Sequence, residues 1–479
     1  MSSTTEQATG ARTWSVAEHL DDILTAVQPL EPIELNLLDA QGCVLVEQVT
    51  VPVALPPFDN SSMDGYAVRA ADTERASEAS PAVLTVIGDV AAGSSGTELT
   101  VGPGRAARIM TGAPLPPGAD AVVPVEWTDG GTGAGPARTM APHSAAPQGS
   151  GGQVRVHRPV TPHAHVRARG GDVCAGDVAL EAGTVLGPPQ IALLSAIGRP
   201  AARVRPRPRV VVLSTGSELA QPGEELAAGQ IYDSNSFALA AAAKDAGAIV
   251  YRVGAVTDDA ETLRATIEDQ LIRADLLVTT GGVSVGAYDV VKEALTSVAE
   301  EEPEQREGEA AEGEEGEDAE GEEGEDAEQA VHRAHVDFRT LAMQPGKPQG
   351  FGTIGPDRTP ILTLPGNPVS SYVSFELFVR PAIRAMMGLA DLHRPVVRAT
   401  LLPPHGAGDE EPAPLTSPEG KRQFLRGTYT GGERPEVRPV GGSGSHLIGA
   451  LAHADALIVL PETVTKAAWG GEVEVVLLG

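Results

Sequence analysis

The sequence contains few aromatic side chains and only two cysteines. Phe, Tyr and Trp make up 3% of the 479 residues, so the hydrophobic cores must be built mainly from Val, Leu, Ile and Ala. Two cysteines cannot form a disulfide framework, and neither Cys43 nor Cys174 stands in a metal-binding spacing. The sequence therefore offers no His/Cys cluster for a structural zinc ion.

Long hydrophobic runs are also missing. No stretch approaches the roughly 18 to 20 apolar residues that span a bilayer. The polar start, Met1 to Gly10, lacks the basic and apolar parts of a signal peptide. These absences predict a cytoplasmic protein that does not bind a membrane.

Basic side chains are scarce relative to acidic ones. The chain has 35 Lys and Arg against 65 Asp and Glu, which gives a net charge of −30. Residues 299–328 hold 17 acidic side chains and a single Arg, and without them the net charge is still −14. A nucleic-acid-binding surface needs a basic face, so we expect no nucleic-acid partner. An anionic substrate would have to be met by local Lys or Arg side chains, a metal ion or backbone N–H groups.

The segment 300–328 departs most from ordinary composition. GEEGEDAE occurs there twice in tandem, at 313–320 and 321–328. Because it has almost no apolar residues, this segment cannot offset its ordering entropy, and we expect a disordered acidic insertion. A passive insertion is the simplest interpretation, and a regulatory or metal-buffering role is the alternative.

Periodicity predicts a multidomain chain of α/β plus β type. Ser15 and Glu18 have capping-box spacing and begin a helix that ends before Pro29. Short strand-like runs and turns fill the first half, up to about residue 200. From 205 onward strands alternate with helices, which predicts a parallel sheet covered on both faces, and the tail 395–479 suggests a small β barrel. The expected strands of the sheet are 210–213, 249–253, 276–279 and 361–364, and the expected helices are 235–247, 259–273, one from 288, and 368–387.

A glycine-rich turn, TTGGVSVGAYD at 279–289, follows one of these strands. Its glycines allow several N–H groups to converge on an anion at a helix N-terminus. It is neither a Walker loop, because Ala287 stands where Lys would follow the second Gly, nor a GxGxxG fingerprint. A packing turn is the alternative, but the carboxyl end of a parallel strand is where open α/β sheets bind ligands. The position therefore favours a ligand site.

Two polar motifs follow at other strand ends, STGSEL at 214–219 and IYDSNS at 231–236. Adjacent carboxylates at strand ends can hold a hard cation, and Glu218, Asp233 and Asp289 are the candidates for Mg²⁺. Asp233 or Ser234 capping the following helix is the alternative.

Two proline-bracketed turns, MQPGKPQGFG at 343–352 and LPGNPVSS at 364–371, fix single polar side chains. Lys347 in such a turn is preorganised to meet an anion, and Lys292 could supply a second positive charge. Either lysine alone is more often a solvated surface charge.

In the N-terminal half the polar stretches are PPFDNSSMDGYAV at 56–68, RIMTGAPLPPGADAVVPVE at 108–126 and RARGGD at 167–172. Their spacing alone assigns no reaction. An Asx turn at Asp59 and Asn60 is the simplest interpretation of the first.

The blocks FDNSSMDGYAV, RIMTGAPLP, RARGGDV, STGSEL, IYDSNS, TTGGVSVGAYD, PGKP and LPGNPVS occur in one order. This ordered set resembles the molybdopterin molybdenumtransferases of the MoeA type, relatives of the E domain of gephyrin. The resemblance implies an elongated β domain (30–53 and 155–184) with an inserted β-rich domain (54–154). It further implies a MoaB/MogA-like α/β molybdopterin-binding domain (13–29 and 185–390, with the disordered acidic insertion 300–328) and a C-terminal β barrel (391–479).

The resemblance also implies a reaction. Adenylated molybdopterin and molybdate would give molybdenum cofactor and AMP, with Mg²⁺ assistance. Family members are homodimers whose active cleft is shared between subunits, and transient contact with other molybdenum cofactor biosynthesis proteins is expected. Two departures stand out, the acidic insertion and Gln344, which replaces a basic residue that some relatives carry before PGKP.

The site residues follow from the motifs and the resemblance together. The catalytic residues expected are Asp64, Thr111, Asp172, Glu218 and Lys347. The magnesium ligands expected are Asp233, Asp289 and Glu218. The residues expected to bind the substrate are Ser214, Thr215, Gly216, Asp233, Ser234, Asn235, Gly281, Gly282, Ser284, Gly286, Lys292, Pro345, Gly346, Pro365, Asn367, Pro368, Arg422 and Arg426.

Two rival functions stay open at this point. A molybdopterin adenylyltransferase shares the α/β domain and would use ATP, but the large N-terminal half argues against it. A scaffold that binds partner peptides, as gephyrin does, is the alternative from a different class.

Overall fold

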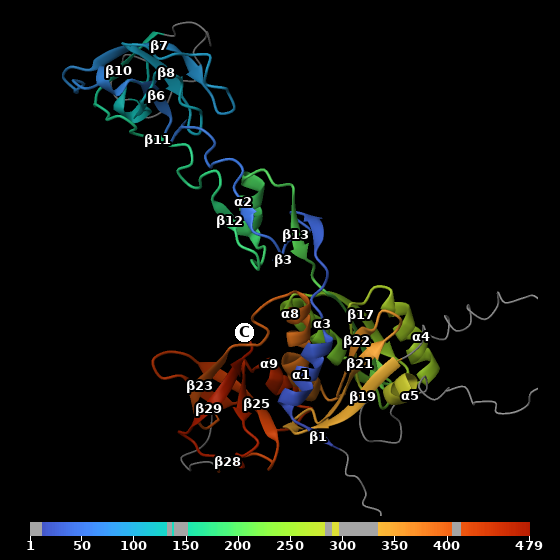
Figure 1. The fold of residues 1–479 in the computed structure, drawn as a ribbon. Coiled ribbons are helices and arrows are strands. Elements are labelled where there is room, and N and C mark those ends of the chain that lie inside the picture. Colours follow the sequence, from blue (N-terminus) through green and yellow to red (C-terminus); the bar gives the residue numbers. More distant parts are fainter. Residues whose placement is uncertain (1–11, 132–136, 138–151, 283–289, 297–333, 405–412) are drawn as a thin grey trace, which may run out of the picture. The chain divides into compact units, whose positions relative to one another are not determined.

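The computed structural model describes residues 12–131, 137, 152–282, 290–296, 334–404 and 413–479. The predicted acidic insertion, together with Ser284, Gly286 and Asp289, lies outside these residues. The chain forms two compact units (Figure 1), residues 1–33, 42–44 and 205–479, and residues 34–41 and 45–204. Within the described part of the chain, no helix has the length and apolarity needed to cross a membrane.

The unit around 45–204 is mostly β, as predicted. Its main sheet has five strands in the order β10-β7-β8-β6-β9, and Tyr66, Val86 and Val123 pack in its core. The strands are β6 (Gly65–Val68), β7 (Ala82–Val90), β8 (Arg105–Ile109), β9 (Ala121–Pro124) and β10 (Gly152–Val156). The shorter strands are β2 (Ile33–Asn36), β3 (Val44–Leu45), β4 (Val49–Thr50), β5 (Asn60–Ser61), β11 (Val166–Arg167), β12 (Val178–Leu180) and β13 (Ala201–Arg205).

One helix of this unit was not expected from the sequence. α2 (Pro188–Ala196) lies where only short strands and turns were predicted. Pro188 suits a first helical position, because its missing N–H has no helical partner there. Only Leu194 of this helix is buried, so the apolar periodicity that would have predicted it is weak.

The larger unit contains a seven-stranded sheet in the order β1-β19-β21-β22-β18-β14-β17. Its strands are β1 (Thr13–Trp14), β14 (Arg209–Thr215), β17 (Ile249–Val256), β18 (Leu276–Thr280), β19 (Ala334–Leu341), β21 (Pro348–Ile354) and β22 (Thr359–Leu364). β17, β14, β18 and β22 are parallel, as predicted, but β21 is antiparallel to both β19 and β22. The four predicted strands are therefore parallel as expected, and the antiparallel pairings involve β19 and β21, which were not among the predicted strands. The links 342–347 and 355–358 are too short for the crossover that a parallel connection requires.

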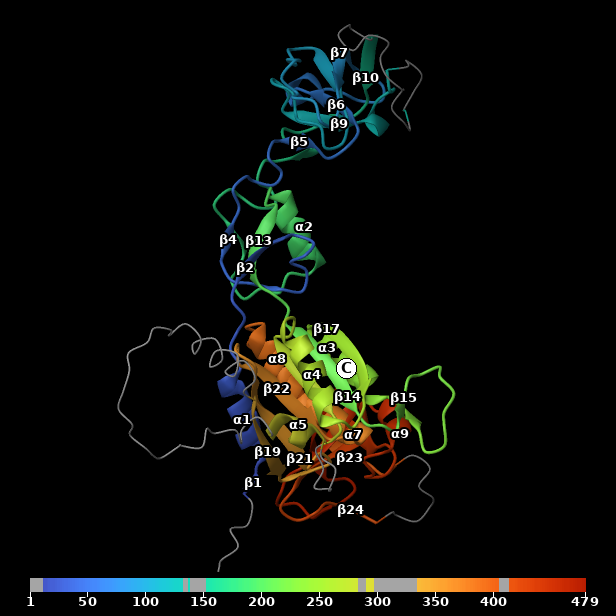
Figure 2. The same ribbon diagram turned by 90° about the vertical axis from the view of Figure 1, so that its right-hand side faces the viewer.

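Helices cover both faces of this sheet (Figure 2). Val210 and Val212 of β14 face a core shared with α1 (Val16–Ala26), α3 (Asn235–Ala246), α7 (Pro368–Ser374) and α8 (Arg380–Met386). Val211 and Leu213 face a second core with α4 (Ala260–Leu271) and α5 (Val290–Thr296). The two-residue alternation along one strand thus fills both faces.

Most helices begin and end close to the predicted residues. α1 starts with the predicted capping box, in which Glu18 N donates to Ser15 Oγ (3.1 Å) and Ser15 N donates to Glu18 Oε2 (2.8 Å). The predicted helix 368–387 is continuous but contains a π-helical segment, η3 (Phe375–Val379), between α7 and α8. Pro381 follows directly, and its ring and missing N–H disturb the ordinary i→i−4 ladder, which accounts for the wider turn.

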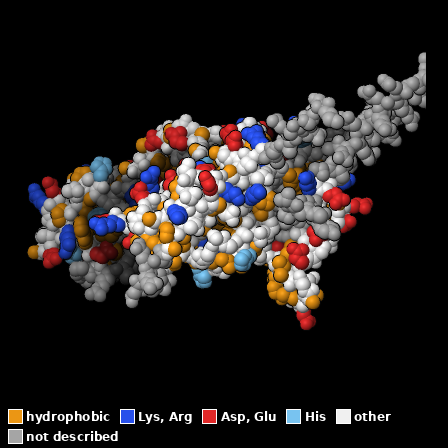
Figure 3. Space-filling model, turned by 90° about the horizontal axis from the view of Figure 1, so that it is seen from below, with side chains coloured by type: hydrophobic (Ala, Val, Ile, Leu, Met, Phe, Trp, Pro, Cys, Tyr) orange, Lys and Arg blue, Asp and Glu red, His pale blue; other side chains and the backbone are white. Residues whose placement is uncertain are grey.

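Buried charges tie this helix to its neighbours. The Glu376 side chain is 1% exposed and accepts hydrogen bonds from Arg394 Nε (2.9 Å) and Nη2 (3.2 Å). Asp245 of α3 accepts from both Arg380 Nη1 (2.9 Å) and Arg394 Nη2 (2.7 Å). At the surface, Figure 3 shows Lys and Arg interspersed with Asp and Glu on the face that it presents.

The C-terminal residues form the predicted β barrel. β25 (Arg422–Thr430), β26 (Glu436–Pro439), β23 (Val396–Leu401), β29 (Glu472–Leu477) and β27 (Ala456–Leu460) pair in that order, and β27 pairs back to β25. β20 (Met343–Gln344) adds to β25 in parallel, and the short helix α9 (Ile448–Ala452) precedes β27. The short strands β24 (Leu415–Thr416) and β28 (Lys466–Ala467) pair with each other.

His19 on α1 predicts a pH dependence of stability. Burial, reinforced by the cationic Arg339, lowers the pKa of His19 from 6.5 to about 4, although Asp22 and Asp337 oppose the shift. The unfolded chain therefore binds a proton below about pH 6.5 that the folded chain does not accept. The contribution of His19 to the free energy of unfolding is fully present above about pH 6.5 and is lost as the pH falls toward 4.

Between about pH 7 and about pH 5 we expect His19 to account for a loss of roughly 2 kcal/mol in the free energy of unfolding. Urea unfolding at both pH values measures this loss. The His19→Gln variant cannot take up the proton and should lack this part of the slope. Equal slopes in the two proteins would refute the assignment.

Candidate functional site

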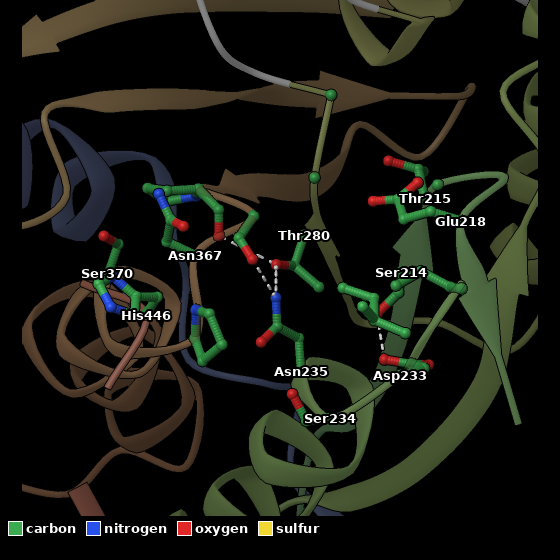
Figure 4. Close-up of a pocket in the computed structure, with 18 of the residues that line it drawn as sticks. Ser214, Thr215, Glu218, Asp233, Ser234, Asn235, Thr280, Asn367, Ser370 and His446 are labelled. Carbon is green, nitrogen blue, oxygen red and sulfur yellow. Dashed lines mark hydrogen bonds between the residues drawn. The ribbon is translucent and has the colours of Figure 1, made fainter. Parts of the chain in front are cut away.

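A cavity of about 770 Å³ opens at the carboxyl ends of β14, β18 and β22 (Figure 4). This is the edge at which the sequence predicted ligand binding. The predicted residues that line it are Ser214, Thr215, Gly216, Glu218, Asp233, Ser234, Asn235, Gly281, Gly282, Pro365, Asn367 and Pro368. The other lining residues include Tyr232, Asp258, Thr280, Pro348, Ser370 and His446.

The end of β14 supplies two oxygen groups. Thr215 Oγ1 is buried and has no hydrogen-bond partner among the described residues. Gly216 has φ of 150°, and a Cβ there would lie 2.5 Å from Glu218 Oε2, so only glycine lets this carboxylate fold back against the backbone. Beyond it, β15 (Leu219–Ala220) pairs in parallel with β16 (Ile231–Tyr232) and brings Asp233 to the site.

Asp233 is buried and its carboxylate is already engaged. It accepts hydrogen bonds from Ser214 Oγ (3.0 Å), Ser236 N (3.1 Å) and Ser236 Oγ (2.5 Å). The bond to Ser236 N caps the start of α3, which is the structural alternative that the sequence left open. Ser234 makes no side-chain capping bond. The role of Asp233 as a magnesium ligand stays a prediction, and this geometry favours an anchoring role.

Asn235 connects α3 to the proline-bracketed turn. Its Nδ2 donates to Gly366 O (2.6 Å) and to Thr280 Oγ1 (3.2 Å), as Figure 4 shows for Thr280. Thr280 Oγ1 in turn donates to Pro365 O (3.1 Å). Three chain segments are thereby held around the cavity.

The first two glycines of the glycine-rich turn form part of the wall. Gly281 has φ of 101°, and a Cβ there would lie 2.5 Å from Thr215 O. The Gly281→Ala variant should therefore lose more stability than Gly223→Ala, whose φ is 99° but whose Cβ would meet nothing within 4 Å. The control is expected to cost roughly 1–2 kcal/mol from the backbone alone, and Gly281→Ala about 1–3 kcal/mol more. Equal midpoints and slopes in urea unfolding would contradict this.

Asp258 and His446 are two ionisable lining residues that the sequence did not predict. Asp258 follows β17, a predicted strand of the same sheet, so its place at a strand end was a usable signal. Its Oδ2 accepts from Ser217 N (2.8 Å), and Ser217 Oγ accepts from Asp258 N (3.2 Å). His446 comes from the barrel, and Val369 N donates to Ser445 O (3.0 Å) beside it. No local pattern predicts that contact.

The predicted cations do not line the cavity. Lys292 and Lys347 are exposed, and Pro345 and Gly346 sit in the turn before Lys347 without reaching the wall. Arg422 pairs with Glu462 (3.2 Å). Arg426 is 3% exposed, donates to Gly442 O, and has its pKa lowered by burial. Among the described lining residues the charged carboxylates are Glu218, Asp233 and Asp258, and none is Lys or Arg.

The smaller unit brings two further predicted residues together. Asp64 Oδ1 accepts hydrogen bonds from Thr111 N (2.7 Å) and Thr111 Oγ1 (2.9 Å), and both residues are exposed. Asp172 is exposed as well, and its N–H donates to Leu55 O (3.0 Å). Asp59 Oδ1 accepts from Arg169 N (2.7 Å), a contact between two of the motifs.

Three family models match the chain in order. The MoeA N-terminal region (domain I and II) matches residues 14–198, a probable molybdopterin binding domain matches 211–317 and 325–385, and the MoeA C-terminal region (domain IV) matches 410–478. Molybdopterin molybdenumtransferase 2 of Mycobacterium tuberculosis is 42% identical over 461 residues, 96% of this chain and 98% of that protein. The chain belongs to the molybdopterin molybdenumtransferase family.

Other molybdopterin molybdenumtransferases and a solved structure are similar over most of their length. The enzyme of that name from Nostoc sp. is 34% identical over 449 residues, 93% of this chain and 88% of that protein. A crystal structure of the molybdopterin biosynthesis MoeA protein from Pyrococcus horikosii aligns with a TM-score of 0.66 and 31% identity, covering 98% of this chain and all of that one. The predicted family and the predicted fold class are confirmed.

Most of the cavity wall lies in the region that matches the probable molybdopterin binding domain. His446 is the exception and lies in the MoeA C-terminal region. The described residues contain no group of three or more His, Cys, Asp or Glu that could hold a metal by itself. Mg²⁺ needs only one or two protein carboxylates when substrate phosphates and water complete its shell. Glu218, Asp258 and the unpartnered Thr215 Oγ1 are hard oxygen donors that fit this requirement.

Proposed function

We propose that this chain inserts molybdate into adenylated molybdopterin and releases AMP, with Mg²⁺ as the assisting ion. The observation that carries the proposal is the cavity at the carboxyl ends of three parallel strands, inside the region that matches a probable molybdopterin binding domain. Its volume suits a ligand of nucleotide size. The names of the relatives support the transfer of molybdenum as the reaction.

The residues of the wall would bind and orient the substrate. Gly281, Gly282 and Gly366 let the substrate approach the backbone closely, and Asn367 and Ser370 offer polar groups. Glu218 and Asp258 would hold Mg²⁺, since both carboxylates lie at the cavity and both belong to its acidic side. When bound, this ion would neutralise charge that develops as the phosphoanhydride is cleaved.

The sharing of the site between two copies is part of the proposal. A homodimer in the cytoplasm would let a second copy supply Asp64, Thr111 and Asp172, the exposed residues of the smaller unit. The two hydrogen bonds that Thr111 donates to Asp64 support this, because they fix one orientation of the carboxylate. Lys347 in its proline-bracketed turn and Lys292 on α5 are both exposed and would add positive charge.

A single-turnover assay tests the proposal. Purified protein is mixed with adenylated molybdopterin, Mg²⁺ and molybdate, and AMP release is followed. Molybdate-dependent AMP release that is lost in Asp64→Ala is expected. Adenylation of molybdopterin when ATP is supplied, without AMP release, would establish the adenylyltransferase instead. Failure of both reactions would favour a scaffold.

A further inference from the structure

We propose that His446 of the barrel binds the phosphate oxygens of the adenylated substrate and that Arg426 positions it. The inference rests on the proposed function. His446 is the only lining side chain in the described part of the cavity that can carry a positive charge. It belongs to the MoeA C-terminal region, whereas the rest of the wall belongs to the probable molybdopterin binding domain. Contacts of its loop bring it to the cavity.

The cavity has two chemically different ends. Glu218 lies at one end, and Asp258 is held there through its hydrogen bonds with Ser217. Figure 4 shows Asn367, Ser370 and His446 gathered at the other end, away from Glu218. A phosphate is repelled by bare carboxylates and attracted by N–H and O–H donors. The substrate's phosphate oxygens are therefore expected beside His446, and a cation beside Glu218.

Several contacts fix the loop that carries His446. Val369 N donates to Ser445 O (3.0 Å), which attaches the loop to α7. Ile448 N donates to His446 O (2.9 Å), and Gly444 leaves room for the ring, because a Cβ there would lie 3.0 Å from its Cε1. The loop is thus shaped to hold the imidazole against the cavity.

Arg426 supports this loop from inside the barrel. It donates to Gly442 O, its own carbonyl accepts from Val440 N (2.9 Å), and its Nε has no partner among the described residues. Burying a guanidinium costs free energy unless its donors are used. Its described side-chain partner belongs to the 441–446 loop, so Arg426 is a positioning residue that acts through His446.

Calorimetric titration with ADP and with adenosine, both in excess Mg²⁺, tests the role of His446. Adenylation of a phosphate creates a diphosphate, which ADP reproduces without turnover. His446→Ala should weaken ADP binding about 10-fold or more and leave adenosine binding unchanged. His446→Arg, which keeps N–H donors at this position, should recover most of the loss. His453→Ala, an exposed histidine outside the cavity wall, serves as the matched control and should bind as the wild type does.

A double-mutant cycle tests the role of Arg426. Arg426→Met should weaken ADP binding, Arg426→Lys should do so less, and Arg426→Met combined with His446→Ala should be no weaker than His446→Ala alone. Additive losses would overturn the positioning role. Unchanged ADP binding in His446→Ala, or equal losses for adenosine and ADP, would overturn the phosphate contact. Either result leaves the proposed function intact if the wild type still releases AMP in a molybdate-dependent reaction.

Discussion

Replacement of Glu218 by Gln is expected to slow molybdate-dependent AMP release by about 100-fold. The Glu218 carboxylate lies at the cavity beside Gly216 and the unpartnered Thr215 Oγ1, where it is available to a cation. An amide of nearly the same shape keeps the packing but removes the charge. Single-turnover AMP release at a Mg²⁺ concentration that just saturates the wild type measures the effect, and a higher Mg²⁺ concentration should restore part of the rate of the variant.

The matched control is Glu225→Gln, which lies in the connection between β15 and β16, after the turn that carries Glu218 and outside the cavity wall. It removes an equal charge from an exposed position and should leave the rate within about 2-fold, since exposed charges are screened. A Glu218→Gln enzyme as fast as this control would remove Glu218 from the mechanism.

Replacement of Glu376 by Ala is expected to lower the free energy of unfolding by about 3–5 kcal/mol. The side chain is 1% exposed and accepts two hydrogen bonds from Arg394, with Arg380 Nε 3.9 Å away. Its removal takes away the buried carboxylate of Arg394 and leaves this nearly buried guanidinium with Asp245, whose side chain is 58% exposed. Denaturant unfolding of the larger unit measures the loss.

Glu472→Ala gives the comparison. Its pairing with Arg398 is equally short (3.0 Å), but both side chains are more than half exposed. Exposed pairs of this kind contribute about 0–1 kcal/mol. Similar losses in the two variants would show that burial of the Glu376 network has no energetic consequence.

The sequence predicted those site residues that belong to a polar motif at the end of a predicted strand or the start of a predicted helix. STGSEL, IYDSNS and LPGNPVSS each place polar residues directly after or before a periodic element, so their arrival at one sheet edge follows from topology. Asp258 also follows a strand of this sheet, β17, but no polar sequence motif around it drew attention to it. His446 could not be found in this way, because its position depends on how the barrel packs against α7.

The fold was predictable to the extent that local patterns decide it. The capping box of α1 and the alternation of β14 are local signals, and both appear as expected. The direction of β21 depends on the length of its connections, which a strand pattern does not contain. α2 buries a single side chain, and its sequence lacks the apolar stripe that identifies a helix.

One core cluster runs through both the α/β sheet and the barrel. Phe424, Leu457 and Val459 of the barrel pack in the same cluster as Leu341 and Met343, and β20 pairs in parallel with β25 of the barrel. A gene shortened after residue 390 would therefore leave apolar surface and unpaired backbone groups on the remaining protein. Such a fragment would be prone to aggregate, so recombination can exchange these two folds between relatives only as a pair.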